Sequence, residues 1–289
     1  MRAMPHIKDF SSDQLETLNE CPYCHSISFD AMFYENGFPL VQCRQCDLMF
    51  LQQRVKFEHV HLIYDAPYHG TGNFAYAKRT GEKRYALIED RLPRGASIFE
   101  DGAGDGSFVA ACQQHGHDVR GCDLGLDAVR EAKASFDIDL FHGHLDDAQV
   151  EPGSLDVFVC FNLLSHLYEP WEYVKKVRSL LKPGGIWFFR TGNRRHVMKW
   201  INREHWSAPE HVFHFNTHVI ESMLDQGGME LVHTSPAFDS DFPYFLYNAG
   251  RAGDSGVHKL ARHLTSYSCL AWTLAGLPKE DEYFIAVTR

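Results

Sequence analysis

The sequence predicts an α/β protein with a doubly wound, Rossmann-like sheet, preceded by a zinc-ribbon-like module at the N-terminus. Helical and strand patterns alternate between about residues 70 and 235, which is typical of βαβ units around a parallel sheet. Residues 155–161 form a continuous apolar run, as expected of a strand that is buried on both faces. Two Cys-x-x-Cys pairs lie within the first 60 residues and indicate a metal-stabilised module.

The predicted elements follow one another in a regular order. Helices are expected at 78–92, 107–115, 126–136, 171–181 and 219–226. Strands are expected at 97–100, 118–122, 138–141, 155–161, 186–190, 229–232 and 283–287, with a sharp turn at 182–185. We therefore predict a zinc-binding module at 1–60 and an α/β domain at 61–289, with a helical insertion at about 239–280 before the last strand.

Composition narrows the class of protein. A hydrophobic content of 44% is sufficient for a buried core, and the formal charge of −10 argues against non-specific binding to a nucleic-acid backbone. The first ten residues lack the apolar segment of a secretory signal, and the longest apolar stretch, 155–164, is too short to span a bilayer. We therefore expect a soluble, cytoplasmic protein without nucleic-acid or membrane partners.

Four of the eight cysteines have the spacing of a zinc site. Cys21 and Cys24 are separated by 18 residues from Cys43 and Cys46, and each pair can place two thiolates on one metal. A site closed by four thiolates offers no open position to a substrate, so a structural role is expected. The alternatives are redox-active dithiols or unrelated surface cysteines. The other four cysteines lie in apolar contexts typical of core packing: Cys112, Cys122, Cys160 and Cys269.

A glycine-rich turn follows the first strand of the α/β region. Residues 100–106 read EDGAGDG, and the turn opens the helix predicted at 107–115. Glycines let the backbone turn tightly and approach a ligand closely. Asp123, at the end of the second strand, is suited to accept hydrogen bonds from a ribose diol. A dinucleotide motif would need a third glycine where Ser107 stands, and the acidic Glu100 favours a ligand with an ammonium and a sulfonium over a pyrophosphate.

Further segments occur in an order that resembles class I S-adenosylmethionine-dependent methyltransferases. Residues 160–170 read CFNLLSHLYEP, similar to the family's segment after the fourth strand, which ends in His-Leu-x-x-Pro. Residues 181–193 read LKPGGIWFFRTGN, similar to the fifth-strand motif. The cysteine module before the fold is similar to a subset that includes sugar and natural-product methyltransferases.

The resemblance implies a set of donor-binding residues. Glu100, Gly102, Gly104 and Gly106 would line the methionine part of S-adenosylmethionine, and Asp123 would hold the ribose. The adenine would lie near Leu124, His144 and Leu145, although the family often has an acidic residue in place of His144. Phe161 and His166 would lie near the reacting methyl. The strand at 283–287 would be the antiparallel strand that distinguishes this fold from a dinucleotide-binding one.

The candidate residues for the acceptor site are histidines in segments that follow predicted strands of the sheet. His211 lies in a Pro-x-His context before an aromatic run, which the resembling subset shares, and a histidine can act as general base at neutral pH. His166 is the second candidate. His205, His211 and His214 could instead hold a second metal, and Trp200 and Trp206 could line the acceptor pocket. A helix expected at 257–274 could form a lid or a homodimer contact.

We therefore expect methyl transfer from S-adenosylmethionine to oxygen or carbon of a small-molecule acceptor, either a sugar or a secondary metabolite. The cofactors expected are S-adenosylmethionine and one structural zinc ion. A nicotinamide-dependent oxidoreductase and a non-catalytic binding module with the same fold are the alternatives. A protein acceptor also stays open at this point.

Overall fold

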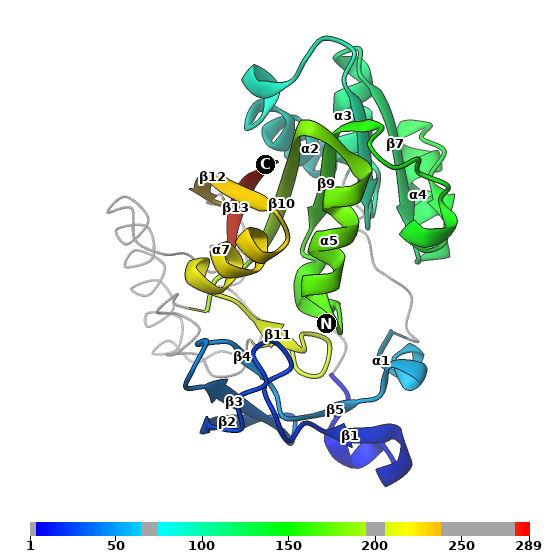
Figure 1. Ribbon diagram of the computed structural model, residues 1–289. Coiled ribbons are helices and arrows are strands. Elements are labelled where there is room, and N and C mark those ends of the chain that lie inside the picture. The colour runs from blue at the N-terminus through cyan, green and yellow to red at the C-terminus, as the bar shows by residue number, and fades with distance from the viewer. Residues whose placement is uncertain (1–3, 65–73, 195–205, 238–280) are drawn as a thin grey trace, which may run out of the picture.

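The computed structural model describes residues 4–64, 74–194, 206–237 and 281–289, and its centre is a seven-stranded sheet (Figure 1). The strand order is β12-β13-β10-β9-β6-β7-β8. The strands are β6 (Ser97–Asp101), β7 (Asp118–Asp123), β8 (Phe141–His142), β9 (Leu155–Phe161), β10 (Leu181–Gly192), β12 (Met229–Pro236) and β13 (Asp281–Thr288). The five from β10 to β8 run parallel, whereas β13 is antiparallel to both of its neighbours. The predicted doubly wound sheet and its antiparallel C-terminal strand are confirmed.

Helices cover both faces of this sheet. One face carries α2 (Phe74–Ala86), α3 (Ser107–Gln114) and α4 (Leu126–Phe136), and the other carries α5 (Pro170–Leu180) and α7 (Thr217–Gln226) (Figure 1). Alternate residues of β9 serve the two cores: Val157 and Val159 belong to the first, Phe158 and Cys160 to the second, and all four are fully buried. This explains the uninterrupted apolar run in the sequence.

Three predicted elements differ from the structure. The third strand was expected at 138–141, but Ile138 and Leu140 are buried without joining the sheet, and β8 contains only Phe141 and His142. The helix expected at 78–92 begins earlier, at Phe74, and ends at Ala86, where a short 3-10 turn follows. The turn expected at 182–185 is a register break within β10. For the third strand the apolar pattern predicted the burial correctly but not the backbone pairing.

The cysteine module forms a second sheet at one end of the molecule (Figure 1). Its order is β11-β4-β3-β2, made of β2 (Phe29–Glu35), β3 (Phe38–Cys43), β4 (Met49–Leu51) and β11 (Phe213–His214). A separate pair joins β1 (Leu15–Thr17) to β5 (Gln53–Val55). Because β11 lies between β10 and α7 in the chain, the module and the α/β domain share main-chain hydrogen bonds and one continuous apolar core.

Two further predictions concern regions that the structure does not fully cover. The helical insertion at about 239–280 and the helix at 257–274 lie outside the described residues. Within the described ranges, no helix combines the length and apolarity needed to cross a membrane.

Candidate functional site

The glycine-rich loop lies where the sheet changes winding direction, between β6 and α3. The sheet is built outward from β6 on both sides, with β7 and β8 on one side and β9 and β10 on the other. The carboxyl end of β6 is therefore the topological switch point, where a doubly wound sheet is expected to bind its ligand. Gly102, Gly104 and Gly106 have φ of +72°, +55° and +73°, a region that favours glycine. A Cβ on Gly102 would have only Leu163 Cδ1 nearby, at 3.9 Å, so this side of the loop is open to a ligand.

Asp123 fixes this loop to the loop after β7. Its Oδ2 accepts a hydrogen bond from the Gly104 N–H at 2.8 Å, and its Oδ1 accepts one from the Gly125 N–H at 2.7 Å. The amides of Gly102 and Ala103 both donate to the Cys122 carbonyl at 3.0 Å. Each carboxylate oxygen of Asp123 keeps a second lone pair, so the side chain can still accept bonds from ribose hydroxyls.

The loop is rich in acidic residues, and most of its backbone amides donate hydrogen bonds to other groups of the protein. Glu100 is 1% exposed, and its Oε2 has no hydrogen-bond partner. Burial raises the pKa of Glu100 well above its usual value, the Arg84 guanidinium opposes this, and Asp105 and Asp123 reinforce it. A pyrophosphate would meet the carboxylates of Asp105 and Asp123 here, whereas a sulfonium and an ammonium would be attracted to them. The residues therefore fit a cationic nucleoside ligand such as S-adenosylmethionine.

Asp101 supports the loop from the opposite face of the sheet. Its Oδ2 accepts a hydrogen bond from the Tyr173 hydroxyl at 2.6 Å, and its Oδ1 accepts one from the Cys122 thiol at 3.2 Å. Burial raises the pKa of Asp101, and these two hydrogen bonds oppose that effect. Tyr173 comes from α5 and was not identified from the sequence, because its role depends on a contact between distant segments.

The remaining predicted donor residues lie at the carboxyl ends of neighbouring strands. Leu124 follows β7 and is 59% exposed, His144 precedes a 3-10 turn after β8, and Leu145 in that turn is buried. Phe161 ends β9 and packs edge-on against Phe108 at a centroid distance of 5.4 Å. The structure thus brings these side chains to one edge of the sheet, and their contacts with the donor stay predictions.

Two further residues come from α2, which the sequence did not connect with the site. The Arg84 guanidinium lies 4.2 Å from the centroid of the Phe161 ring, and its Nε donates to the Tyr283 hydroxyl at 3.3 Å. Gly81, one turn earlier, allows α2 to approach the start of α3, since a Cβ there would lie 2.2 Å from the Ser107 carbonyl oxygen. A glycine within a helical pattern gives no local signal of such a contact.

Replacing Gly81 tests this close approach. We expect Gly81→Ala to lower the free energy of unfolding by roughly 1–3 kcal/mol, because two backbone segments must move apart to accommodate the methyl group. Urea denaturation monitored by circular dichroism measures the effect. Lys78→Ala, an exposed change on the same helix, is the control and should stay within about 0.5 kcal/mol of the parent. Equal stability of the two variants would contradict the packing argument.

The four cysteines of the N-terminal module converge on one point. The sulfurs of Cys21, Cys24, Cys43 and Cys46 lie within 4.8 Å of one another, with Cys21 to Cys46 at 3.6 Å and Cys24 to Cys43 at 3.5 Å. Tetrahedral zinc with bonds of about 2.3 Å places its sulfur ligands about 3.8 Å apart. The thiol set therefore fits zinc. Among the described residues no other group meets the criterion for a metal site, and His205 of the alternative histidine site lies outside them.

Both cysteine pairs use the same turn. The residue after each pair, His25 or Asp47, has a positive φ of 59° or 67°. Its N–H donates to the carbonyl of the first cysteine, at 2.9 Å to Cys21 and 3.1 Å to Cys43. This repeated geometry turns both thiols of a pair toward the same side.

Asp47 also connects the second pair to the α/β domain. Its carboxylate accepts a hydrogen bond from Asn216 Nδ2 at 2.6 Å and forms an ion pair with Arg194. Asn216 caps the start of α7, where its Oδ1 accepts from the Val219 N–H, and the Arg194 N–H donates to the Phe215 carbonyl. The cysteine module therefore holds the chain at the end of β10 and the start of α7.

Two predicted acceptor-side histidines are in contact with each other. The rings of His166 and His211 are perpendicular, with centroids 4.5 Å apart. Tyr64, at the end of α1 (His61–Tyr64), adds its hydroxyl 2.8 Å from His166 Nδ1. His166 donates its backbone N–H to Leu163, the residue whose side chain lies next to Gly102. The cluster thus combines three distant segments, and Tyr64 was not identified from the sequence.

His166 is neutral at physiological pH. Burial lowers its pKa to about 4, and a hydrogen bond with the Glu210 backbone carbonyl opposes this shift. The Tyr64 hydroxyl, which lies close to His166 Nδ1, also donates to the Glu210 carbonyl at 3.4 Å. Since the folded chain binds a proton at His166 more weakly than the unfolded chain, the corresponding stability is lost as the pH falls from about 6.5 to about 4. His166 is therefore suited to orient its neighbours.

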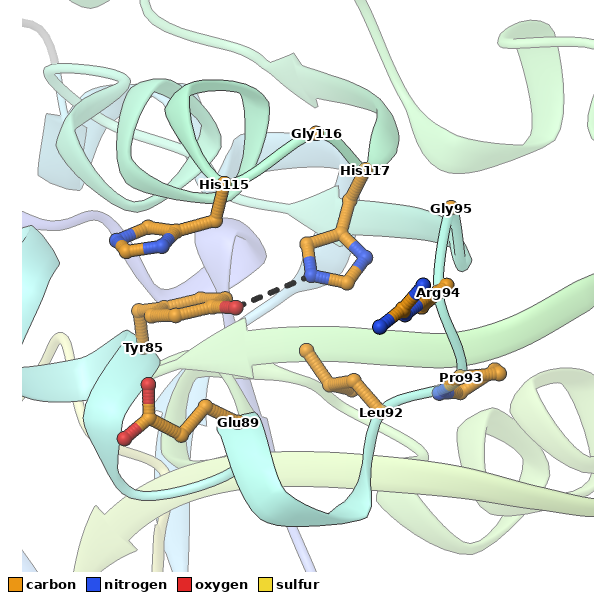
Figure 2. Close-up of a pocket in the computed structure, with 9 residues that line it drawn as sticks. All are labelled: Tyr85, Glu89, Leu92, Pro93, Arg94, Gly95, His115, Gly116 and His117. Atoms are coloured by element: carbon orange, nitrogen blue, oxygen red, sulfur yellow. Dashed lines mark hydrogen bonds between the residues drawn. The ribbon is translucent and has the colours of Figure 1, made fainter.

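A hollow of about 460 Å³ lies elsewhere, at the amino ends of β6 and β7 (Figure 2). Two histidines line it, but both are used in packing. His115 stacks on Tyr85 at 4.0 Å, while His117 Nδ1 accepts from the Ala96 N–H and its Nε2 lies 3.2 Å from the Tyr85 hydroxyl. The hollow is on the opposite edge of the sheet from the glycine-rich loop, and we assign it no part in the chemistry.

The sheet with its antiparallel β13 and the acidic glycine-rich loop at its switch point define the catalytic domain of an S-adenosylmethionine-dependent methyltransferase. A family model described as a methyltransferase domain matches residues 75–234, and the chain belongs to this family.

Curated relatives agree with this class. A Mycolicibacterium smegmatis protein named "Probable S-adenosylmethionine-dependent methyltransferase" is 26% identical over 54% of this chain and 62% of its own length. The ubiquinone biosynthesis O-methyltransferase of Pectobacterium carotovorum is 29% identical over 43% of this chain and 55% of its own length. A protein of the same name from Xanthomonas campestris is 33% identical over 38% and 48%. The chain thus spans about half the length of the curated relatives it matches.

Solved structures support the fold. The methyltransferase in a complex with the Haloferax volcanii Trm112 methyltransferase activator aligns with a TM-score of 0.52 and 18% identity, covering 74% of this chain and 94% of that one. A SAM-dependent methyltransferase from Archaeoglobus fulgidus aligns with a TM-score of 0.50 and 13% identity, covering 73% and 94%. At these identities the likeness concerns the fold alone.

Proposed function

We propose that the chain transfers a methyl group from S-adenosylmethionine to oxygen or carbon of a small molecule, a sugar or a secondary metabolite, with His211 as general base. The observation that carries the proposal is the glycine-rich loop with its aspartates, which suits a sulfonium donor and is connected to the histidine cluster through Leu163. The relatives named as O-methyltransferases of ubiquinone biosynthesis support a small-molecule acceptor and favour oxygen.

In this proposal some residues bind the methyl donor, and one histidine accepts a proton. When bound, S-adenosylmethionine supplies an electrophilic methyl group. Gly102 and Gly104 would lie against its methionine part, and Asp123 would accept hydrogen bonds from its ribose. His211 would accept the proton of an acceptor hydroxyl, which is worth a factor of about 10²–10⁴ in rate. Positioning supplies much of the remainder, since well-oriented reactants gain roughly 7–11 kcal/mol.

The four-cysteine site would hold one structural zinc ion. All four ligands come from the protein, so the ion would have no position for a substrate. Its role would be to fold the module that shapes the acceptor side, since β4 pairs with β11 just after His211.

Isothermal titration of the chain with S-adenosylmethionine, S-adenosylhomocysteine and NAD tests the proposed class of donor. We expect micromolar binding of the first two and none of NAD, because the loop carries acidic groups where a pyrophosphate would lie. Asp123→Asn should weaken the binding of both methyl-donor ligands by roughly tenfold or more, because the carboxylate proposed to accept hydrogen bonds from the ribose hydroxyls is lost. Binding of NAD alone would identify an oxidoreductase, and the absence of all binding would indicate a scaffold.

An acceptor panel then tests the substrate class. Radiolabelled S-adenosylmethionine should transfer its methyl group to sugars or to hydroxylated aromatic metabolites, and a protein or nucleic acid should not be labelled. Labelling of a protein substrate alone would contradict the small-molecule proposal.

A further inference from the structure

We propose that Glu35 is a positioning residue for the acceptor site, because its buried carboxylate fixes the turn that carries His211. The inference rests on the proposed role of His211 as general base. Glu35 ends β2 and is 8% exposed. Its Oε1 accepts a hydrogen bond from the Trp206 N–H at 2.9 Å, and its Oε2 accepts one from the Ala208 N–H at 2.7 Å. The cysteine module thereby contacts the backbone of a segment more than 170 positions later in the sequence.

The two bonds flank a residue with an unusual backbone conformation. Ser207 has a φ of +61°, in the left-handed region that residues with a side chain disfavour. Its carbonyl accepts the His211 N–H at 2.9 Å and so closes the turn. By holding the amides on both sides of Ser207, the Glu35 carboxylate stabilises the conformation from which His211 is presented.

The hairpin tip next to Glu35 adds a third bond. Asn36 and Gly37 are the two central residues between β2 and β3, and both have positive φ, 49° and 81°. An Asn-Gly pair is the sequence preferred for a two-residue turn with this geometry. Asn36 Nδ2 donates to the Ala208 carbonyl at 2.7 Å. Both backbone polar groups of Ala208 are therefore bound by the end of one hairpin.

The other side of His211 is also fixed. The Val212 N–H donates to the Ser165 carbonyl at 2.8 Å, and the Val212 carbonyl accepts the Leu51 N–H at 3.1 Å. Trp206 is fully buried, with Phe33 at 5.1 Å and His214 at 5.0 Å between ring centroids. His211 thus lies between an anchor at Val212 and the Glu35 contacts. Of these, Glu35 supplies the charge-assisted bonds, which are the stronger kind.

Glu35→Gln tests the proposal with little change in size. The glutamine amide offers one oxygen and presents an NH₂ group to the other backbone N–H, so one of the two bonds is lost. We expect hydrogen exchange of the Trp206 and Ala208 amides to accelerate about tenfold or more through local opening. We also expect the NMR signal of the His211 Cε1–H group to shift, a change that loss of stability elsewhere would not cause. This signal is identified by its absence in His211→Ala.

The control lies in the same strand. Asp30→Asn removes an exposed carboxylate of β2 that pairs with Arg44, and it should leave the exchange of the 206–208 amides and the His211 signal unchanged. The affinity for S-adenosylmethionine should stay within about twofold of the parent in both variants, since neither contacts the glycine-rich loop. Failure of the parent chain itself to bind S-adenosylmethionine would remove the proposed function and would leave the exchange result to be judged on its own.

Asn36→Gly is the second variant and protects the test against misfolding of Glu35→Gln. Glycine keeps the positive φ of the turn and removes only the bond to Ala208, so we expect about threefold faster exchange at 206–208 and a smaller shift of the His211 signal. A His211 signal that stays in place in every folded variant would overturn the proposal and would reduce Glu35 to a residue that stabilises the fold alone.

Discussion

Removal of zinc from the four-cysteine site is expected to lower the melting temperature by roughly 8 °C. Structural zinc contributes directly to folding, and a loss of about 5 kcal/mol corresponds to such a change in a chain of this size. Cys21 and Cys43 are at most 1% exposed and belong to the apolar core that also includes α5 and α7, so disorder in the module would expose core residues of the α/β domain. Differential scanning calorimetry with and without a chelator measures the effect, after mass spectrometry has established the zinc content.

Cysteine variants separate the metal from a simple loss of packing. Cys43→Ser should melt at a lower temperature and should no longer respond to the chelator. Cys112→Ala removes a thiol that is equally buried, in the core on the other face of the sheet, and should retain zinc and chelator sensitivity. A chain that contains about one zinc ion and melts at the same temperature after its removal would show that the ion does not support the fold.

The regular part of the fold could be predicted from the sequence because burial leaves a local pattern there. The bounds predicted for the helix at 126–136 and the strand at 155–161 are those of α4 and β9, the first amphipathic and the second buried on both faces. The prediction of the third strand was wrong because Ile138 and Leu140 are buried in the core without pairing in the sheet. No pattern indicated β11, since two residues are too short for periodicity and their partners in β4 lie far away in the sequence.

In the candidate site, too, the features with a local sequence pattern could be predicted and those that depend on distant contacts could not. The glycine-rich loop and the cysteine pairs are local patterns, and the positive φ values and the converging sulfurs are the geometry that these patterns predict. Arg84, Tyr64 and Glu35 act through contacts between distant segments, so a helical arginine, a tyrosine and a strand glutamate carried no signal of their own. Side chains that bind across the fold are therefore the part that the sequence leaves open.

Loss of the proposed general base is expected to have the largest effect on turnover. His211→Ala should lower kcat by a factor of about 10²–10⁴ when the acceptor is a hydroxyl, because the proton must leave as the methyl group arrives. The affinity for S-adenosylmethionine should stay within about twofold, since Asp123 and the glycines are untouched. Initial rates with the best acceptor of the panel, combined with titration calorimetry, measure the two quantities separately.

His218→Ala is the matched control, because it removes an exposed histidine seven positions later and should leave kcat unchanged. A rate for His211→Ala close to that of the parent would instead transfer the role to His166, and the pH profile would decide. With its pKa lowered to about 4 by burial, His166 stays neutral at every pH above that value, so a rate governed by it would be constant down to about pH 4. A base that is protonated so weakly is a poor proton acceptor at neutral pH, since efficiency is greatest when the pKa lies near the working pH. This is the physical reason for proposing His211, rather than His166, as the general base.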